Sequence, residues 1–479
     1  MSVPRRGRCF RLAPNESEGE REAMRGISVA VIGRILALPL ALAAAWACVR
    51  AGWPREQASM AAIVVLAAVL WVTEALPIFA TALLVIAAEV FLLTNPLESP
   101  GWDFSAGTTP SLRTVLGAIA DPVLVLFFSG FVLARAAVKE RVDVLFGGWL
   151  LHPFSSGPAR MLFGIIGVAA LFSMWMSNTA TAAFMLTLVA PLIAQLPPGA
   201  TFRKALLLAV PFACNIGGMG TPIASPPNAI ALGYLNRAGH HVSFGEWMLF
   251  AVPLVLVLLT VLGLVLLKTF PPGEMRGFQM GKVERLSARG IVTVAVFVVT
   301  VLLWITEAWH GVPSSVVALV PITVLLVAGV IGRLDINELD WDVLLLIAGG
   351  FALGWGLSAT QLDQRIVGWL PGGESGSGLL LTALVVATLT LGTFLSNTAV
   401  ANLLLPIGIA AAVATAQQAV GMAIALTASL TMALPISTPP NAMAFARGDL
   451  AVADMVRVGA LVGVIGGGIV LVGAWWLVR

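Results

Sequence analysis

Two short polar motifs occur twice in this 479-residue chain, and both have the residue types to bind ions. Ser177-Asn178-Thr179 is followed by Pro226-Pro227-Asn228, and Ser396-Asn397-Thr398 is followed by Pro439-Pro440-Asn441. Each motif interrupts a long apolar run and so breaks a helix. The broken ends present N–H groups that attract anions and carbonyls that suit a small hard cation such as Na⁺. Together the four breaks could hold an anion beside cations without a buried lysine.

The same motifs also have a purely structural interpretation. Ser, Asn and Thr are ordinary helix N-caps, and Pro-Pro-Asn is an ordinary helix breaker. For one tripeptide alone this interpretation is preferable. Recurrence at matching positions favours the functional one, because independent caps need not share the four residues Ser-Asn-Thr-Ala that 177–180 and 396–399 have in common. The prolines at 226–227 and 439–440 stop helices in either interpretation.

The composition decides the class of protein that must position these motifs. Hydrophobic residues make up 59% of the chain and charged residues 11%, whereas soluble domains carry about 25% charged residues. The net charge of +3 is too small to indicate a nucleic-acid partner. The three cysteines form no CxxC, and no two histidines have the i, i+4 spacing of a helical zinc pair. The sequence therefore predicts an all-α polytopic membrane protein with no organic cofactor.

About 11 apolar stretches are expected to cross the membrane, which takes about 20 residues of helix. They are residues 27–49, 58–75, 78–93, 122–137, 205–235, 247–267, 291–305, 316–330, 343–357, 421–445 and 456–478. The first is interpreted as an uncleaved span, because the charged region before it is too long for a signal peptide. Residues 161–196 and 379–414 are broken midway by Ser-Asn-Thr, so each is predicted to be a re-entrant hairpin.

The order of landmarks in the first half returns in the second. Trp71-Val72-Thr73-Glu74 recurs as Trp304-Ile305-Thr306-Glu307, and Gly130-Phe131 recurs as Gly350-Phe351. The Ser-Asn-Thr and Pro-Pro-Asn motifs, each followed by Ala, complete the same order in both halves. Each half has five crossings and one hairpin, and the span at 27–49 stands outside the repeat. An odd number of crossings inverts the second half relative to the first, as in many secondary transporters.

The basic residues give the orientation. With the N-terminus in the cytoplasm, 21 of the 27 Lys and Arg residues fall inside, which agrees with the positive-inside rule. The six outside are Arg50, Arg55, Arg113, Arg237, Arg365 and Arg479. We therefore expect a multi-pass protein of the plasma membrane with a cytoplasmic N-terminus.

From about residue 58 to its end, the chain resembles the divalent anion/sodium symporter family, the bacterial relatives of the sodium-coupled di- and tricarboxylate and sulfate carriers. The resemblance rests on the two Ser-Asn-Thr motifs, the two Pro-Pro-Asn motifs and the Trp-x-Thr-Glu that opens each half. It implies a homodimeric, elevator-type transporter of a bacterial inner membrane. It also implies a cytoplasmic tail (1–26), two scaffold segments (27–152 and 291–370), two transport segments (153–270 and 371–479) and a cytoplasmic linker (271–290).

The resemblance further implies which residues bind sodium and substrate. The first sodium site would comprise Ser173, Ser177, Asn178 and the carbonyl of Ala224. The second would comprise Asn397 and backbone oxygens near Gly392, Leu395 and Ser437. The substrate carboxylates would contact Asn178, Thr179, Ser225, Pro226, Asn397, Thr398, Thr438 and Pro439. Gly392 stands where the family has a hydroxyl residue, so no side-chain ligand is expected there. Asp121 and Asp342 begin equivalent spans and are interpreted as helix N-terminal charges.

The implied function is sodium-coupled uptake of a divalent anion, with a C4-dicarboxylate such as succinate as the first choice. A dianion entering a cell against about 100 mV faces roughly 4.6 kcal/mol, which two Na⁺ would cancel. A sodium-independent dicarboxylate exchanger, or a sulfate or citrate carrier of the same fold, stays open as an alternative. An intramembrane enzyme is disfavoured because the sequence has no HExxH and no Gly-x-Ser-x-Gly with a paired histidine.

Overall fold

The computed structural model describes residues 29–94, 110–273, 277–279, 286–368 and 377–478. Within these ranges the regular structure is helical throughout, with no strand. The all-α prediction is therefore confirmed. The predicted tail at 1–26, the middle of the predicted linker and the predicted boundary at 370–371 lie outside the described residues.

Seven helical segments of the described chain are long and apolar enough to cross a membrane. They are α2 (Val29–Arg50), α3 (Arg55–Thr73), α5 with η1 and α6 (Leu112–Gly117, Ala118–Ala120 and Pro122–Lys139), α12 (Phe244–Thr269), α13 (Ala288–Ile305), α18 (Trp341–Ala359) and α24 (Val452–Val478). Each coincides with one of the predicted crossings. The chain is thus a multi-pass membrane protein.

The other four predicted crossings are short or broken helices. They are α4 (Ile78–Leu93), α10 with α11 (Phe202–Gly217 and Pro226–Arg237), α15 with α16 (Ser314–Val317 and Leu319–Val327) and α22 with α23 (Gln417–Ser429 and Pro439–Phe445). The breaks between α10 and α11 and between α22 and α23 fall at the Pro-Pro-Asn motifs, as the sequence predicts. Proline cannot continue the preceding helix but suits the first turn of the next one.

The two Ser-Asn-Thr motifs form the tips of two helical hairpins. One pairs α8 (Pro158–Ser173) with α9 (Asn178–Ala194), and the other pairs α20 (Ser377–Phe394) with α21 (Asn397–Ala411). Their arms have 15 to 18 residues, or about 22–27 Å at 1.5 Å per residue, which is short of the hydrocarbon core. Ser177 and Ser396 cap the second arms, since their Oγ atoms accept the backbone N–H groups three residues on at 3.3 and 3.2 Å. The geometry is that expected of re-entrant hairpins.

Small structural details repeat at equivalent positions of the two halves. The Trp71 Nε1–H donates to the Ile78 carbonyl at 3.3 Å, and the Trp304 Nε1–H donates to the Ser314 carbonyl at 3.0 Å. Arg141 and Gln361 both have positive φ, at 57° and 56°. They precede the equivalent helices α7 (Val142–Leu151) and α19 (Leu362–Val367). The duplication is therefore present in the structure as well as in the sequence.

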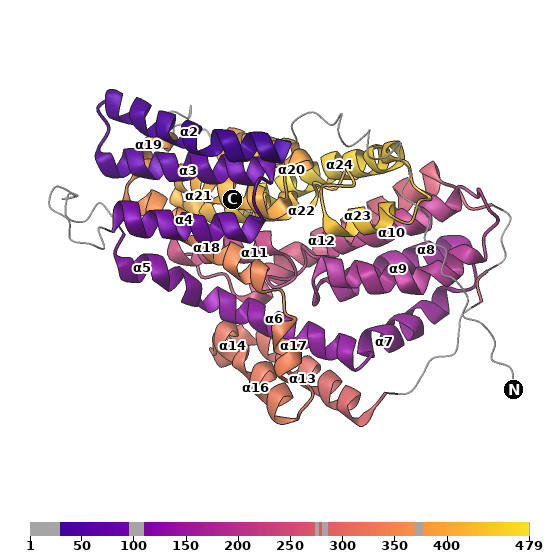
Figure 1. Ribbon diagram of the computed structural model, residues 1–479. Helices are drawn as coiled ribbons and strands as arrows, with labels where there is room; N and C mark the ends of the chain where they lie inside the picture. The colour runs from indigo at the N-terminus through magenta and orange to yellow at the C-terminus, as the bar shows by residue number, and fades with distance from the viewer. Residues whose placement is uncertain (1–28, 95–109, 274–276, 280–285, 369–376, 479) are drawn as a thin grey trace, which may run out of the picture.

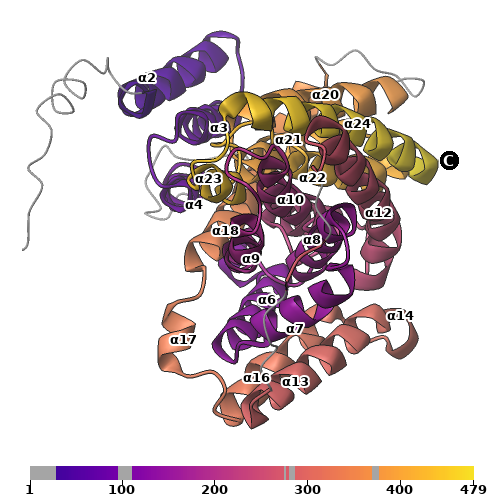
Figure 2. The same ribbon diagram turned by 90° about the vertical axis from the view of Figure 1, so that its right-hand side faces the viewer.

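Helices of the first half pack against helices of the second half around the broken helices. α10 packs against α23, α11 against α21 and α22, and α12 against α24. α2 and α3 lie along one edge of the molecule (Figure 1), and α13 and α16 lie at the opposite edge with the short helices α14 (Glu307–His310) and α17 (Arg333–Asn337) (Figure 2). This arrangement places all four motif breaks in the interior, between the two edges.

An ion-pair cluster joins α17 to α6. The Lys139 Nζ lies 2.6 Å from Asp335 Oδ2, and the Arg135 Nε lies 3.2 Å from Asp335 Oδ1. Burial of Asp335 opposes its ionisation, but hydrogen bonds from Lys139, the Gly332 N–H and Arg135 outweigh it and hold the pKa of Asp335 below its ordinary value. The cluster fixes the connection between α16 and α18 to the first half of the chain.

Candidate functional site

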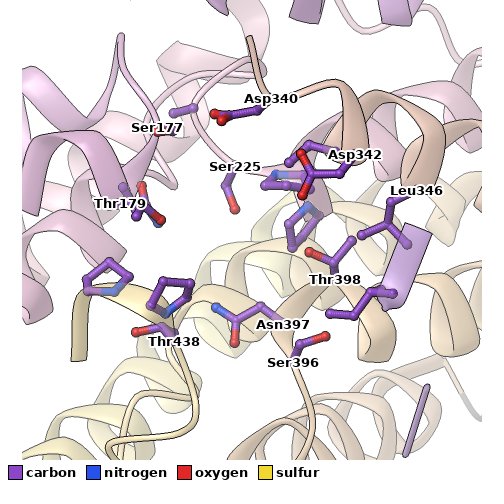
Figure 3. Close-up of a pocket in the computed structure, with 18 of the residues that line it drawn as sticks. Ser177, Thr179, Ser225, Asp340, Asp342, Leu346, Ser396, Asn397, Thr398 and Thr438 are labelled. Atoms are coloured by element: carbon purple, nitrogen blue, oxygen red, sulfur yellow. The ribbon is translucent and has the colours of Figure 1, made fainter. Parts of the chain in front are cut away.

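The four motif breaks line one cavity of about 700 Å³. Its wall comprises the two hairpin tips, the turns before α11 and α23, the start of α4, and parts of α6 and α18. Figure 3 shows Thr179, Ser225, Asn397 and Thr398 around the same space. Motifs from the two halves of the chain are thus brought together, as the duplicated pattern predicts.

All eight residues that the sequence assigns to the substrate line this cavity. They are Asn178, Thr179, Ser225, Pro226, Asn397, Thr398, Thr438 and Pro439. Three helices of twelve residues or more, α9, α11 and α21, begin at the cavity wall. The first N–H groups of α9 and α21 are therefore available to an anion, whereas α11 begins with Pro226 and Pro227, which have no N–H to donate.

The residues assigned to the first sodium site form a group of oxygen atoms beside the cavity. The Ser173 hydroxyl is fully buried and lies 2.7 Å from Asn178 Oδ1 and 2.8 Å from the Cys214 carbonyl oxygen. Ser177, Asn178 and Ala224 line the cavity itself. Hydroxyl, amide and carbonyl oxygens are the ligand types that suit Na⁺ at a broken helix.

The residues assigned to the second sodium site lie in and behind the cavity wall. Asn397 and Ser437 line the cavity, whereas Leu395 and Gly392 do not. The Ser437 hydroxyl donates to the Thr393 carbonyl at 3.1 Å. Asn397 Oδ1 accepts a hydrogen bond of 2.8 Å from Thr431, a residue that no sequence motif indicated.

The asparagines of the two Pro-Pro-Asn motifs hold the broken helices in shape. The Asn228 Nδ2 donates to the carbonyls of Gly218 and Thr221, both at 2.8 Å. The Asn441 Nδ2 donates in the same way to two carbonyls of its own break, both at 2.9 Å. These carbonyls have left their helices and would otherwise lack a donor inside a membrane protein. For these two asparagines the structural role is the observed one.

A third buried asparagine connects the breaks of the two halves. The Asn215 Nδ2 in α10 donates to Thr438 Oγ1 at 3.2 Å and lies 3.3 Å from Asn441 Oδ1. Asn215 also lines the cavity. It was not predicted from the sequence, although an amide within the apolar run of α10 was a usable signal.

The charged residues at the cavity are two carboxylates. Asp340 and Asp342 line it beside the start of α18 (Figure 3), and its lining residues include no Lys or Arg. Asp342 is therefore part of the cavity wall as well as a charge in the first turn of α18. Partial loss of water around Asp340, together with the neighbouring Asp342 carboxylate, raises the pKa of Asp340. An anion in this cavity would meet neutral donors and negative side chains, without a basic side chain among the lining residues.

The sequence matches a protein-family model described as citrate transporter over residues 68–428 and again over 301–479. The chain belongs to the citrate transporter family. An uncharacterised transporter of Haemophilus influenzae is 32% identical over 426 residues, which cover 84% of this chain and 88% of that protein. The resemblance to divalent anion/sodium symporters is confirmed, and this member of the citrate transporter family is a transporter rather than an enzyme.

Other relatives of this citrate transporter family member have more specific descriptions. A sodium-dependent dicarboxylate transporter, SdcS, of Staphylococcus aureus is 29% identical over 473 residues, which cover 88% of this chain and 86% of SdcS. The inorganic phosphate transporter PHO87 of Saccharomyces cerevisiae is 28% identical over 74% of this chain but only 38% of its own length. The relatives therefore share transport and differ in substrate.

Two solved transporter structures share the fold. The YdaH transporter of Alcanivorax borkumensis superposes with a TM-score of 0.54 at 15% identity, over 83% of this chain and 97% of YdaH. MtrF of Neisseria gonorrhoeae superposes with a TM-score of 0.52 at 13% identity, over 84% of this chain and 94% of MtrF. At these identities the likeness supports the polytopic transporter fold alone.

Proposed function

We propose that this protein is a secondary active transporter that couples sodium entry to the uptake of a divalent anion, with a C4-dicarboxylate such as succinate as substrate. The observation that supports it is the single cavity lined by both Ser-Asn-Thr tips and both Pro-Pro turns, with no Lys or Arg among its lining residues. SdcS, a relative over most of the chain, is described as sodium-dependent and dicarboxylate-transporting.

The charges of the site explain why cations would be needed. A dianion would be held by the N-terminal N–H groups of α9 and α21 and by neutral hydroxyl and amide groups, near the carboxylates of Asp340 and Asp342. Two Na⁺ bound by the oxygens around Asn178 and Asn397 would neutralise the dianion. They would also remove the cost of roughly 4.6 kcal/mol for carrying two negative charges against about 100 mV. A third cation would make uptake responsive to the membrane potential.

The movement is proposed to be of the elevator type. The segments at 153–270 and 371–479 would form the moving transport domain, and those at 27–152 and 291–370 the fixed scaffold. The packing of α10 on α23 and of α12 on α24 supports one body made from both transport segments. We further propose a homodimer in a bacterial inner membrane, inverted halves, and a cytoplasmic N-terminus.

Competition between anions for uptake identifies the substrate. Uptake of labelled succinate into proteoliposomes is measured with an excess of unlabelled succinate, citrate, sulfate or phosphate outside. The proposal expects the strongest inhibition from C4-dicarboxylates, because a dianion with two separated carboxylates matches two helix-tip motifs facing each other. Stronger inhibition by citrate, which the family description favours, or by sulfate or phosphate would reassign the site to that anion.

Counterflow separates a symporter from an exchanger. Vesicles loaded with unlabelled succinate are placed in labelled succinate with sodium absent on both sides. A sodium-coupled symporter accumulates little label under these conditions, whereas a sodium-independent exchanger accumulates it rapidly.

A further inference from the structure

Each hairpin-tip asparagine is held by one buried hydroxyl, but the two hydroxyls come from different elements. In the first half, Ser173 of α8 donates to Asn178 Oδ1 at 2.7 Å. In the second half, Thr431, just after α22, donates to Asn397 Oδ1 at 2.8 Å. Ser173 and Thr431 are 0% and 2% exposed. The same contact is therefore made from the hairpin arm in one half and from the broken helix in the other.

The positions that lack the hydroxyl are both glycine. Gly392 precedes the second Ser-Asn-Thr motif by the same interval at which Ser173 precedes the first. Gly218 likewise precedes the first Pro-Pro-Asn motif by the interval at which Thr431 precedes the second. A Cβ on Gly392 would lie 2.6 Å from Thr431 Cγ2, and a Cβ on Gly218 would overlap the Asn178 amide. Each half thus has room for one side chain beside its asparagine. The hairpin arm supplies that side chain in the first half, and the segment after α22 supplies it in the second.

Each of these hydroxyls lies among more oxygens than it can donate to. Ser173 Oγ is 2.7 Å from the asparagine Oδ1 of its half and 2.8 Å from the Cys214 carbonyl oxygen. Thr431 Oγ1 is 2.8 Å from the asparagine Oδ1 of its half and 2.8 Å from the Ala428 carbonyl oxygen. A hydroxyl has one proton, so it can donate to only one of its two oxygen neighbours at a time. A small cation satisfies such a group, because hard cations accept several oxygen ligands at once.

We propose that Thr431 supplies the hydroxyl ligand of the second sodium site, in place of the hairpin position occupied by Gly392. This inference rests on the proposed sodium coupling and names one of the groups that perform it. Thr431 Oγ1 and Asn397 Oδ1 contact the ion together, and the same hydroxyl positions the Asn397 amide toward the cavity. Ser173 and Asn178 have the equivalent roles in the first site.

The decisive variant is Thr431→Val, which keeps the shape of the side chain and removes the hydroxyl. The sodium concentration for half-maximal succinate uptake should rise about tenfold or more, as is typical when a contact that orients a metal ligand is lost. The rise in melting temperature that sodium alone produces in detergent should shrink in parallel, and this readout needs no substrate. Thr431→Ser should behave like the wild type.

Thr427→Val is the matched control. Thr427 lies one turn earlier, in α22, is fully buried, and its hydroxyl has no hydrogen-bond partner. Its loss should leave the sodium dependence unchanged. A second test moves the hydroxyl: Thr431→Gly alone should lose sodium affinity, and Gly392→Ser combined with Thr431→Gly should recover it to within a few-fold of wild type.

The proposal and its premise fail in different ways. If wild-type uptake does not respond to sodium, the proposed coupling and the role of Thr431 fall together. If the wild type responds and Thr431→Val responds equally, the role of Thr431 alone is overturned. The role is also overturned if the folded double variant is no better than Thr431→Gly.

Discussion

At the scale of single residues, Asn178 and Asn397 connect the cavity to the buried oxygen groups behind it. Each lines the cavity and accepts a hydrogen bond from a buried hydroxyl. Asn178→Ala and Asn397→Ala should each reduce succinate uptake to background. The loss in stability should be only about 1 kcal/mol, since one hydrogen bond is lost in each case. Uptake into proteoliposomes and melting in detergent measure the two effects, and wild-type uptake by either variant would remove that residue from the site.

The motif asparagine Asn228 should behave in the opposite way. Its amide donates to two carbonyls of the α10–α11 break, so Asn228→Ala leaves both without their donor. An unsatisfied buried group costs about 1–3 kcal/mol. The melting temperature should therefore fall clearly below that of Asn178→Ala, which serves as the comparison. Equal melting temperatures would mean that water or another group replaces the amide.

The sequence predicted the cavity wall better than the contacts behind it. All eight predicted substrate residues line the cavity. They could be predicted because helix breaks at repeated motifs are recognisable from the sequence alone. Thr431 and Asn215 were missed, since neither belongs to a repeated motif and each meets its partner only after folding. Their roles depend on the packing of helices that are far apart in the sequence.

At the scale of elements, α8 and α10 approach so closely that only glycine fits between them. A Cβ on Gly217 would lie 2.5 Å from the Ala170 backbone Cα. Gly217→Ala should destabilise the protein by about 1–3 kcal/mol, as overpacking generally does. Gly167→Ala, in α8 but with nothing within 4 Å of the added carbon, is the control and should be neutral or stabilising by up to about 1 kcal/mol. The prediction fails if the two variants melt alike.

The helix breaks show which features of the fold could be predicted from sequence patterns. The two hairpins were predictable because a polar break lies midway in each long apolar stretch. The split of the predicted span at 316–330 into α15 and α16 was not predicted. Pro321 has no N–H to donate to the Val317 carbonyl, and α15 ends at Val317. This proline was in the sequence, so the break could have been predicted from it.

At the scale of the whole molecule, Asp335 joins α17 in the second half of the chain to α6 in the first. Its folded-state pKa lies below the ordinary value, so its contribution to stability is present at neutral pH and is lost as the pH falls through the folded-state pKa. Asp335→Asn should therefore lower the melting temperature at pH 7, and the difference from wild type should vanish in strong acid. Asp449→Asn, in a more exposed pair with Arg203, is the control and should have little effect at either pH. A constant difference at all pH values would contradict the assignment.

The central claim is that two copies of one membrane module join their broken helices around a single cavity that holds a divalent anion with sodium. Uptake of labelled succinate into proteoliposomes, with and without an inward sodium gradient, tests it most directly. We expect concentrative uptake only with the gradient, and loss of that uptake in Asn178→Ala and Asn397→Ala alike. Equal uptake with potassium replacing sodium, or gradient-driven uptake that survives both substitutions, would contradict the claim.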